Sequence, residues 1–443
     1  MDDQFVGYNA WAAEALDIAV NADLVYEETS EGGDRGVYIS DEIQAQTTIL
    51  SIPAASLLNV HTMAQSVLRD LVSLPLREDD CLAWFLIYER FVNPQSKWKR
   101  HLDVMPQAFH NILYFTEDEI NMLQGSNVYY VALQLKQQVA SDFGELQRTL
   151  LPTTLRLLHA DHSADALVRV FTIENYKWAL SVIWSRFVSI AIHATAADDD
   201  DDTTAAVKSM VPVFDMFNHD PFAQMSHGFD PTTNSFVLRS HQHWPAGSQV
   251  YMNYGALPNH KLLTLYGFVL PSNPFDVVEL WAPMHEDVPS YDRKLALLTA
   301  HGLAEHATST PFDLYSDSVN DELLASLRIQ RLSDTELSQF ESGTPHFAFE
   351  PIHDDNEKDT LTALIYALQQ MLAAFPTAVE DDEAELAARQ EGDDEQERGD
   401  EASHHVMALH LRVSDKRILH AQIDMLQELL LPVLARLNLA SQD

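Results

Sequence analysis

The chain has 443 residues, of which 46% are hydrophobic and 21% charged, a composition typical of a folded globular protein of two or three domains. Asp and Glu number 67 against 27 Lys and Arg, giving a formal net charge of −40. This charge excludes a general nucleic-acid binder and argues against docking on anionic lipid, because both surfaces carry phosphate.

The first sixty residues predict a short helix followed by strands. Apolar spacing predicts the helix over 4–20, and β-type segments follow at 24–26, 36–39 and 47–52. A glycine turn at 32–34 precedes the second strand. The acidic N-terminus has no basic region followed by an apolar stretch, so neither a secretory signal nor a mitochondrial transit peptide is predicted.

From about 62 to 192 the pattern becomes helical, with helices predicted over 82–91, 128–141 and 173–192. The single cysteine, Cys81, excludes an internal disulfide and a cysteine-based zinc cluster. It opens an apolar helix and is expected to be a core residue rather than a nucleophile. The most apolar window carries Arg186 at its centre, so no membrane span is predicted. We expect a cytoplasmic or nuclear protein.

Two acidic tracts interrupt the second half of the chain. Five aspartates at 198–202 predict a solvated loop, since they lack the spaced ligands and central glycine of a calcium loop. The tract at 376–403 holds twelve acids and two arginines, and predicts a disordered loop between two helices.

Strands and then helices fill the remainder. Segments 211–214, 235–238, 249–252 and 277–281 predict strands, and 259–268 a short helix. Helices are predicted over 291–301, 359–374 and 415–437, the last packing in a core rather than in a coiled coil because Pro432 interrupts its stripe. The histidine pairs 241/243 and 404/405 are predicted to lie on the surface, and no metal site is expected.

Common nucleotide, hydrolase and zinc motifs are missing, and one polar cluster remains. Asp215, Asn218 and His219 follow an apolar segment. Tyr254 follows a second apolar segment and directly precedes a glycine. Taken singly each is weak evidence, because such residues usually make turns or packing contacts.

The order and spacing of these residues resemble the SET-domain protein methyltransferases. Asp215-Met-Phe-Asn218-His219, then Tyr254-Gly with Asn259, then Tyr266-Gly267-Phe268 are similar to the class typified by the Rubisco large-subunit lysine methyltransferase and the actin-histidine methyltransferase. Further similar segments are Asp34-Arg35-Gly36-Val37 with Ile52-Pro53, Tyr176-x-Trp178-Ala179 with Ser185-Arg186, the stretch from Glu89 to Phe115, and Leu411-Arg412 to Leu419.

The resemblance implies an α+β fold: a β-rich SET domain with a large helical insertion, followed by an all-α substrate-binding domain. The implied parts are 1–61 (N-terminal helix and first SET part), 62–192 (insertion), 193–284 (second SET part with the cofactor and catalytic motifs) and 285–443 (C-terminal domain). It further implies methyl transfer from S-adenosyl-L-methionine to a lysine of a protein substrate, with a basic segment around that lysine suited to the acidic chain. We expect a monomer.

The resemblance also assigns residues to roles. Tyr254 is the implied catalytic residue, its hydroxyl lying near the transferring methyl, and Asn259 is expected to fix the local fold. The implied cofactor-binding residues are Gly33, Asp34, Arg35, Arg186, Asp215, Met216, Phe217, Asn218, His219, Tyr254, Tyr266, Gly267 and Phe268. Within this set, Arg186 would contact the cofactor carboxylate, unless it pairs with an acid of the chain. The implied substrate-binding residues are Phe187, Val188, Tyr251 and Tyr266.

Two alternatives stay open. The actin-histidine class carries an asparagine two residues after its matched arginine, where this chain has Val188, so lysine is favoured over histidine as acceptor. A non-catalytic acidic scaffold for basic proteins, built on the same fold, is the other alternative.

Overall fold

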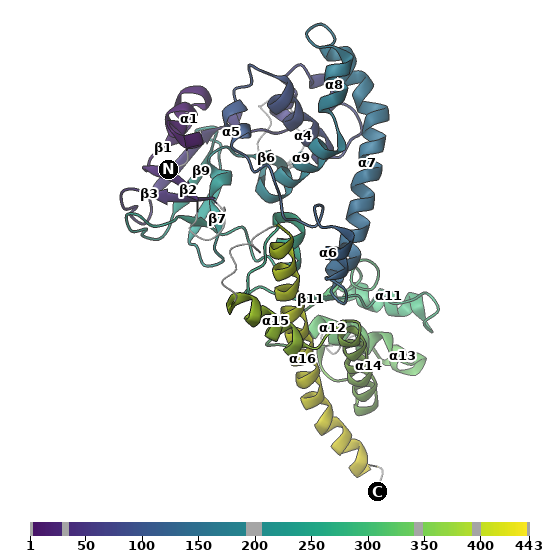
Figure 1. Cartoon of the computed structure of the whole chain (residues 1–443). Coiled ribbons are helices and arrows are strands. Elements are labelled where there is room, and N and C mark those ends of the chain that lie inside the picture. The colour runs from purple at the N-terminus through teal and green to yellow at the C-terminus, as the bar shows by residue number, and fades with distance from the viewer. Residues whose placement is uncertain (1–2, 29–34, 192–205, 341–348, 392–399, 441–443) are drawn as a thin grey trace. The chain divides into compact units, whose positions relative to one another are not determined.

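The protein is described by a computed structural model covering residues 3–28, 35–191, 206–340, 349–391 and 400–440 (Figure 1). The chain forms two compact units, each built from non-consecutive segments. The first comprises Met1–Tyr114, Leu133–Ala256 and Thr264–Gly267, and the second comprises Phe115–Ala132, Leu257–Leu263 and Phe268–Asp443.

Short strands of the first unit form small sheets, which are antiparallel except for the parallel pair of β7 and β10. The largest has the order β1-β4-β9-β8, and β2 pairs with β3 in a hairpin. The N-terminal elements are η1 (Asp3–Phe5), α1 (Tyr8–Leu16), β1 (Ala19–Val20), β2 (Leu24–Glu28), β3 (Arg35–Ile39), β4 (Thr48–Pro53) and η2 (Ala54–Ser56). The later strands are β5 (Phe187–Ala191), β6 (Ala206–Met210), β7 (Asn218–His219), β8 (Met225–Asp230), β9 (Ser235–Ser240) and β10 (Tyr251–Met252).

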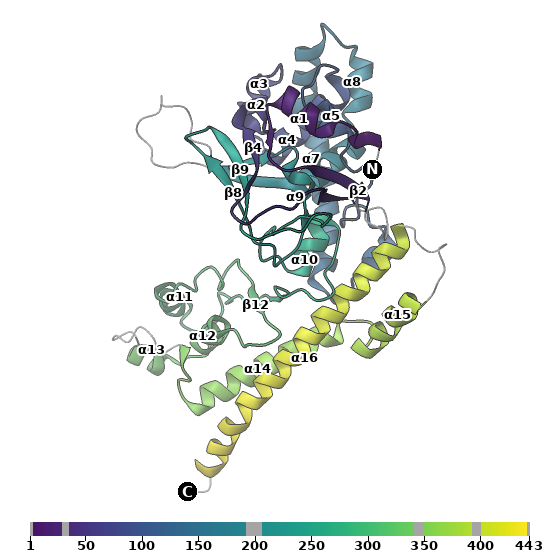
Figure 2. The ribbon, with the colours of Figure 1, turned by 90° about the vertical axis from the view of Figure 1, so that its left-hand side faces the viewer.

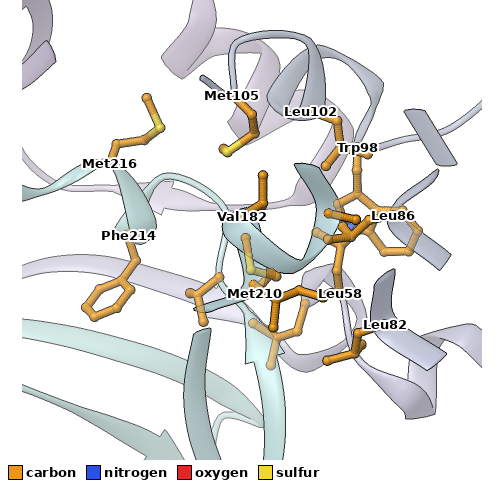
Figure 3. Close-up of a cluster of buried hydrophobic side chains, with 14 of the residues drawn as sticks. Leu58, Leu82, Leu86, Trp98, Leu102, Met105, Val182, Met210, Phe214 and Met216 are labelled. Atoms are coloured by element: carbon orange, nitrogen blue, oxygen red, sulfur yellow. The ribbon is translucent and has the colours of Figure 1, made fainter. Parts of the chain in front are cut away.

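Helices follow the N-terminal strands, and their apolar faces make the core of the first unit. These are α2 (Val60–Met63), α3 (Arg69–Val72), α4 (Glu78–Ile87), η3 (Tyr88–Val92), α5 (Lys99–Asp103), α8 (Ala164–Val170) and α9 (Ile173–Arg186). Helix α4 is apolar all round and packs on α9. Figure 3 shows Val182 of α9 among Met105, Met210, Phe214 and Met216, all buried. The segment around Asp215 is therefore anchored in the core.

Two predictions about this unit were wrong. The helix predicted over 173–192 ends at Arg186, because Phe187–Ala191 alternates β-branched residues and pairs with β6. The segment 211–214 is not a strand: its strand lies earlier, at β6, and Val213 adopts a left-handed conformation, φ 73°, that starts a turn. Cys81 is buried, as predicted, and burial raises the pKa of its thiol to about 11, which disfavours a nucleophile. The 198–202 tract lies outside the described residues.

The second unit is mainly helical. Its elements are α6 (Glu117–Asn121), the start of α7 (Asn127–Leu158), α10 (Asn259–Lys261), β11 (Val278–Leu280), α11 (Tyr291–Ala300), β12 (Phe312–Leu314), α12 (Asp321–Gln330), α13 (Asp334–Phe340), α14 (Asp354–Ala373), α15 (Val379–Glu391) and α16 (Asp400–Ala440). The π-helical turn η5 (Leu262–Tyr266) runs from this unit into the first. Helices α14 and α15 both pack along α16 (Figure 2).

The acidic tract at 376–403 is not simply a disordered loop, because α15 occupies residues 379–391 of it. Asp382 is buried and accepts hydrogen bonds from both Arg412 and Lys416 of α16. Leu386 packs on the same helix. A buried acid with two cations, the apolar contacts of Leu386, and more exposed ion pairs such as Glu383 with Arg417 hold a segment whose composition predicts disorder.

The long helix α16 starts far earlier than the predicted residue 415, and it continues past Pro432, as the prediction over 415–437 has it. His404 is buried rather than exposed: its ring stacks on Phe115, and its Nδ1 lies 2.9 Å from a carboxylate oxygen of Glu119. By length and composition alone, His404–Leu439 could cross a membrane, but the buried Arg412 and Lys416 fit a core helix of a folded unit.

Candidate active site

The polar cluster predicted from the sequence is assembled in the first unit by one short parallel pairing. Strand β7 pairs with β10, placing Tyr251 opposite Asn218 and Met252 opposite His219. The turn at Val213 and the single 3-10 turn η4 (Phe214–Met216) lead the chain into β7. This pairing brings the Asn-His dipeptide beside the loop that carries Tyr254.

Tyr254 is held from several sides. Its hydroxyl donates to the carbonyl oxygen of Phe217 at 2.6 Å, and its backbone N–H donates to Nδ1 of His219 at 3.1 Å. Its ring stacks on those of His219 and Tyr266, with centroids 4.9 and 5.2 Å away. Burial raises the pKa of the Tyr254 hydroxyl well above its usual value. Tyr254 is therefore a protonated, oriented hydroxyl in an aromatic stack.

The turn after Tyr266 requires a glycine. Gly267 has φ +81°, and a Cβ there would lie 2.7 Å from the backbone nitrogen of Asn111 and from the carbonyl carbon of His110. This close approach fixes the backbone directly after Tyr266, the last ring of the aromatic stack. Phe268, also predicted to line the cofactor site, belongs to the second unit and is not assigned to the stack.

Asn218 connects the cluster to the N-terminal hairpin. Its side-chain amide donates to the backbone oxygen of Arg35 at 2.9 Å. Arg35 in turn donates to the backbone oxygen of Val104 at 3.0 Å and lies over the ring of Phe5 at 4.5 Å. The start of β3 is thus tied to the Asn-His segment, as expected for a backbone that approaches a ligand. The predicted ligand-contact residues 33 and 34 lie outside the described residues.

Arg186 and Asp215 each carry a buried polar atom that the protein leaves unsatisfied. Arg186 Nη1 donates to the backbone oxygen of Asp215 and lies 3.7 Å from the sulfur of Met216. Arg186 Nε and Asp215 Oδ1 are buried and have no hydrogen-bond partner among the described residues. Such atoms are costly unless a ligand satisfies them. The alternative in which Arg186 pairs with an acid of the chain is not seen within the described part.

A cavity of about 810 Å³ lies in the same unit, and Arg35 is the predicted site residue that lines it, whereas Arg186, Asp215, Asn218 and Tyr254 do not. It is lined by Arg35, by the loop 104–107 and by the basic side chains of Lys99 and Arg100, among others. Sequence reasoning did not assign this loop to a site. The only signal was the spacing of Trp98 and Pro106, which matched the helical insertion of the related class without indicating a lining role.

The predicted substrate-binding residues lie on β5, on β10 and in η5, which are not paired with one another. Phe187 and Val188 open β5, opposite Met210 and Ser209 of β6. The Tyr251 hydroxyl donates to the side-chain oxygen of Gln249 at 2.7 Å. A role for these residues in binding substrate stays a prediction.

Asn259, predicted to fix the local fold, makes local hydrogen bonds in the second unit. Its side chain exchanges hydrogen bonds with the backbone N–H and oxygen of Leu270, both at 3.0 Å, and donates to Asp276 at 2.7 Å. Within the described ranges, no group of three or more His, Cys, Asp or Glu side chains could hold a metal ion.

Comparison with solved structures defines the fold. The SET domain of LSMT bound to lysine and AdoHcy superposes with a TM-score of 0.78 at 22% identity, covering 98% of this chain and 93% of that chain. Rubisco LSMT bound to AdoMet superposes with a TM-score of 0.76. A family model described as Rubisco LSMT substrate-binding matches residues 285–419. The chain therefore has the fold of these SET-domain structures, its residues 285–419 match the Rubisco LSMT substrate-binding family, and the predicted α+β fold class is confirmed.

The chain is also similar in sequence to curated methyltransferases. The chain is 27% identical over 405 residues to the actin-histidine N-methyltransferase of Gallus gallus and 24% identical to that of Homo sapiens. These alignments cover 88% of this chain and 63% of each relative, so the chain spans less than two thirds of their length. The chain is thus similar in sequence to members of the class that the sequence motifs indicated.

Proposed function

We propose that this chain is an S-adenosylmethionine-dependent protein methyltransferase that acts on a lysine side chain. The observation that carries the proposal is the assembly in one unit of Tyr254, the Asn218-His219 dipeptide and the two unsatisfied groups of Arg186 and Asp215. Solved structures with this fold hold AdoMet or AdoHcy, and the curated relatives are named as methyltransferases.

The residues present fit that cofactor. Arg186 Nε is a buried cationic donor suited to the carboxylate of the cofactor's amino-acid end, a charge-assisted pairing. Asn218 uses its amide nitrogen on Arg35 and so keeps its side-chain oxygen as an acceptor for the cofactor's amino group. His219 and Tyr266 would border the adenosine side. When bound, the sulfonium supplies an activated methyl group.

Tyr254 has the position and protonation to orient the incoming amine. Its proton is committed to the Phe217 carbonyl, so the lone pairs of its oxygen are available to accept an N–H from a neutral amine. The lysine must lose its proton before it can attack, and the apolar, aromatic surroundings favour the neutral form. Alignment of the amine with the methyl and sulfur is then the main contribution of the protein.

Lysine is proposed as the acceptor because Val188 offers no side-chain hydrogen bond to an imidazole nitrogen. Histidine is the second candidate, since the curated relatives are actin-histidine methyltransferases. The non-catalytic acidic scaffold is the third.

One experiment separates the three. Purified protein is incubated with a cell extract and S-adenosylmethionine carrying an isotopic methyl, and the labelled residue is located by mass spectrometry. Labelled lysine supports the proposal, and labelled histidine replaces it with the second candidate. Cofactor binding without any labelled protein, with Tyr254→Phe indistinguishable from wild type, would favour the scaffold.

A further inference from the structure

A buried chain of hydrogen bonds ends at Oδ2 of Asp215, the carboxylate oxygen other than the unsatisfied Oδ1. The hydroxyl of Tyr8, on α1, lies 2.6 Å from Nδ1 of His101, on α5. His101 Nε2 lies 3.0 Å from Oδ2 of Asp215. The side chains of His101 and Asp215 are both 0% exposed, so water does not compete for these bonds.

The direction of the bonds follows from the tyrosine. Burial raises the pKa of the Tyr8 hydroxyl well above its usual value, so the hydroxyl keeps its proton and can donate it. When Tyr8 donates to Nδ1, a neutral imidazole carries its own proton on Nε2. His101 then donates to Asp215, and both donors in the chain point toward the carboxylate.

Arg186 contacts the backbone of Asp215 but not its carboxylate. Arg186 already donates to the backbone oxygen of Asp215, yet within the described residues no ion pair joins its guanidinium to the Asp215 carboxylate. Without His101 at Oδ2, the described residues would offer the Asp215 carboxylate no hydrogen bond, although the Arg186 guanidinium lies at the backbone oxygen of the same residue. Rotation of the side chain onto that guanidinium would then be favourable.

We propose that His101, oriented by Tyr8, is a positioning residue that keeps Asp215 from capturing Arg186, so that Arg186 stays available to a carboxylate-bearing ligand. The proposal rests on the proposed function, since the ligand is taken to be the amino-acid end of S-adenosylmethionine. It gives a role to a fully buried histidine to which the resemblance assigns none.

The binding test uses His101→Leu, which removes both hydrogen bonds and keeps an apolar side chain. The dissociation constant for S-adenosylmethionine, measured by calorimetry, should rise about 10- to 100-fold, and Tyr8→Phe should cause a smaller rise. The control is Thr154→Val, which removes the buried bond from Trp84 Nε1 to Thr154 Oγ1, at 2.9 Å, in the same unit away from the site. A similar loss of affinity in the control would overturn the positioning role.

A double variant distinguishes positioning from simple structural support. With Asp215→Asn in place there is no carboxylate to capture Arg186, so adding His101→Leu should weaken binding by less than about twofold. If His101→Leu weakens S-adenosylmethionine binding as much in the Asp215→Asn background as in wild type, the losses of affinity add. That result would refute the capture of Arg186 by Asp215.

A third readout does not depend on the cofactor. The crystal structure of ligand-free His101→Leu should show the Asp215 carboxylate paired with the Arg186 guanidinium, and wild type should not. If wild type fails to bind S-adenosylmethionine, the proposed function is wrong, but this structure still decides the positioning claim. An unchanged Asp215 side chain in His101→Leu would disprove it.

Discussion

At the scale of single residues, Tyr254 concentrates the chemistry that the proposed function needs. Tyr254→Phe removes one hydroxyl and leaves the stack with His219 and Tyr266 intact. We expect kcat to fall about 10²- to 10³-fold, because orientation of the nucleophile is lost, while the dissociation constant of S-adenosylmethionine changes less than about threefold. Single-turnover kinetics and calorimetry measure the two. An equal loss in both would mean that the hydroxyl serves cofactor binding instead.

Asp415 makes the stability of the second unit depend on pH. Burial raises its pKa to about 7, and the nearby Asp276 carboxylate adds to the rise. An unfolded aspartate has a pKa of about 3.9, so between these values only the folded state holds the proton. Stability is therefore highest at low pH and falls as pH rises through the folded pKa.

Asp415→Asn should remove that slope. Relative to wild type, the variant should gain stability between pH 5 and pH 8 by up to about 3 kcal/mol, as measured by chemical denaturation. Asp424→Asn, at an exposed position on the same helix, is the control and should follow wild type at both pH values. If the difference in unfolding free energy between wild type and Asp415→Asn is the same at pH 5 and at pH 8, the expectation is contradicted.

At the scale of elements, α15 depends on one carboxylate. Asp382→Asn leaves Arg412 and Lys416 without their buried anion, which should cost about 3–5 kcal/mol. Glu380 lies two residues before Asp382 on the same helix and is exposed, so Glu380→Gln should lower the free energy of unfolding by less than about 0.5 kcal/mol. Thermal unfolding and hydrogen exchange of residues 379–391 measure both. Equal stability of the two variants would show that α15 is held by other contacts.

This ion cluster also changes how the scaffold alternative is tested. Deleting the whole acidic tract would remove Asp382 and disturb the second unit, so loss of a partner could be blamed on misfolding. Neutralising only exposed acids of the tract, with Asp382 retained, separates the two effects.

Some elements could be predicted from sequence and others could not, for physical reasons. Arg186, Asn218 and Tyr254 were found because their chemistry is encoded in short local motifs. His101 and Tyr8 were missed because their hydrogen bond joins residues 93 positions apart, and no local pattern reports such a contact. The end of α9 was misplaced for a similar reason: β5 is defined by its pairing with β6, across the acidic insertion.

At the scale of the whole molecule, the proposed function together with the net charge of −40 predicts that substrate binding depends on salt. A basic peptide should be attracted to the acidic surface, and salt should screen that attraction. We expect KM for a lysine-rich peptide to rise several-fold between about 50 and 300 mM salt, with kcat little changed. A peptide with neutral residues around the target lysine is the control. Equal salt dependence of the two peptides would mean that net charge does not select the substrate.

The division of the chain into two units has a consequence for modularity. The chain passes between the units five times, after Tyr114, Ala132, Ala256, Leu263 and Gly267. Part of what supports the substrate-binding domain comes from far upstream: Arg412 donates to the backbone oxygen of Met122 at 3.2 Å, and Glu119 is the partner of His404. A fragment beginning at residue 285 would lack these contacts. The domain is therefore recognisable as a block of sequence but not separable as a block of structure, and it could not be transplanted by a single cut.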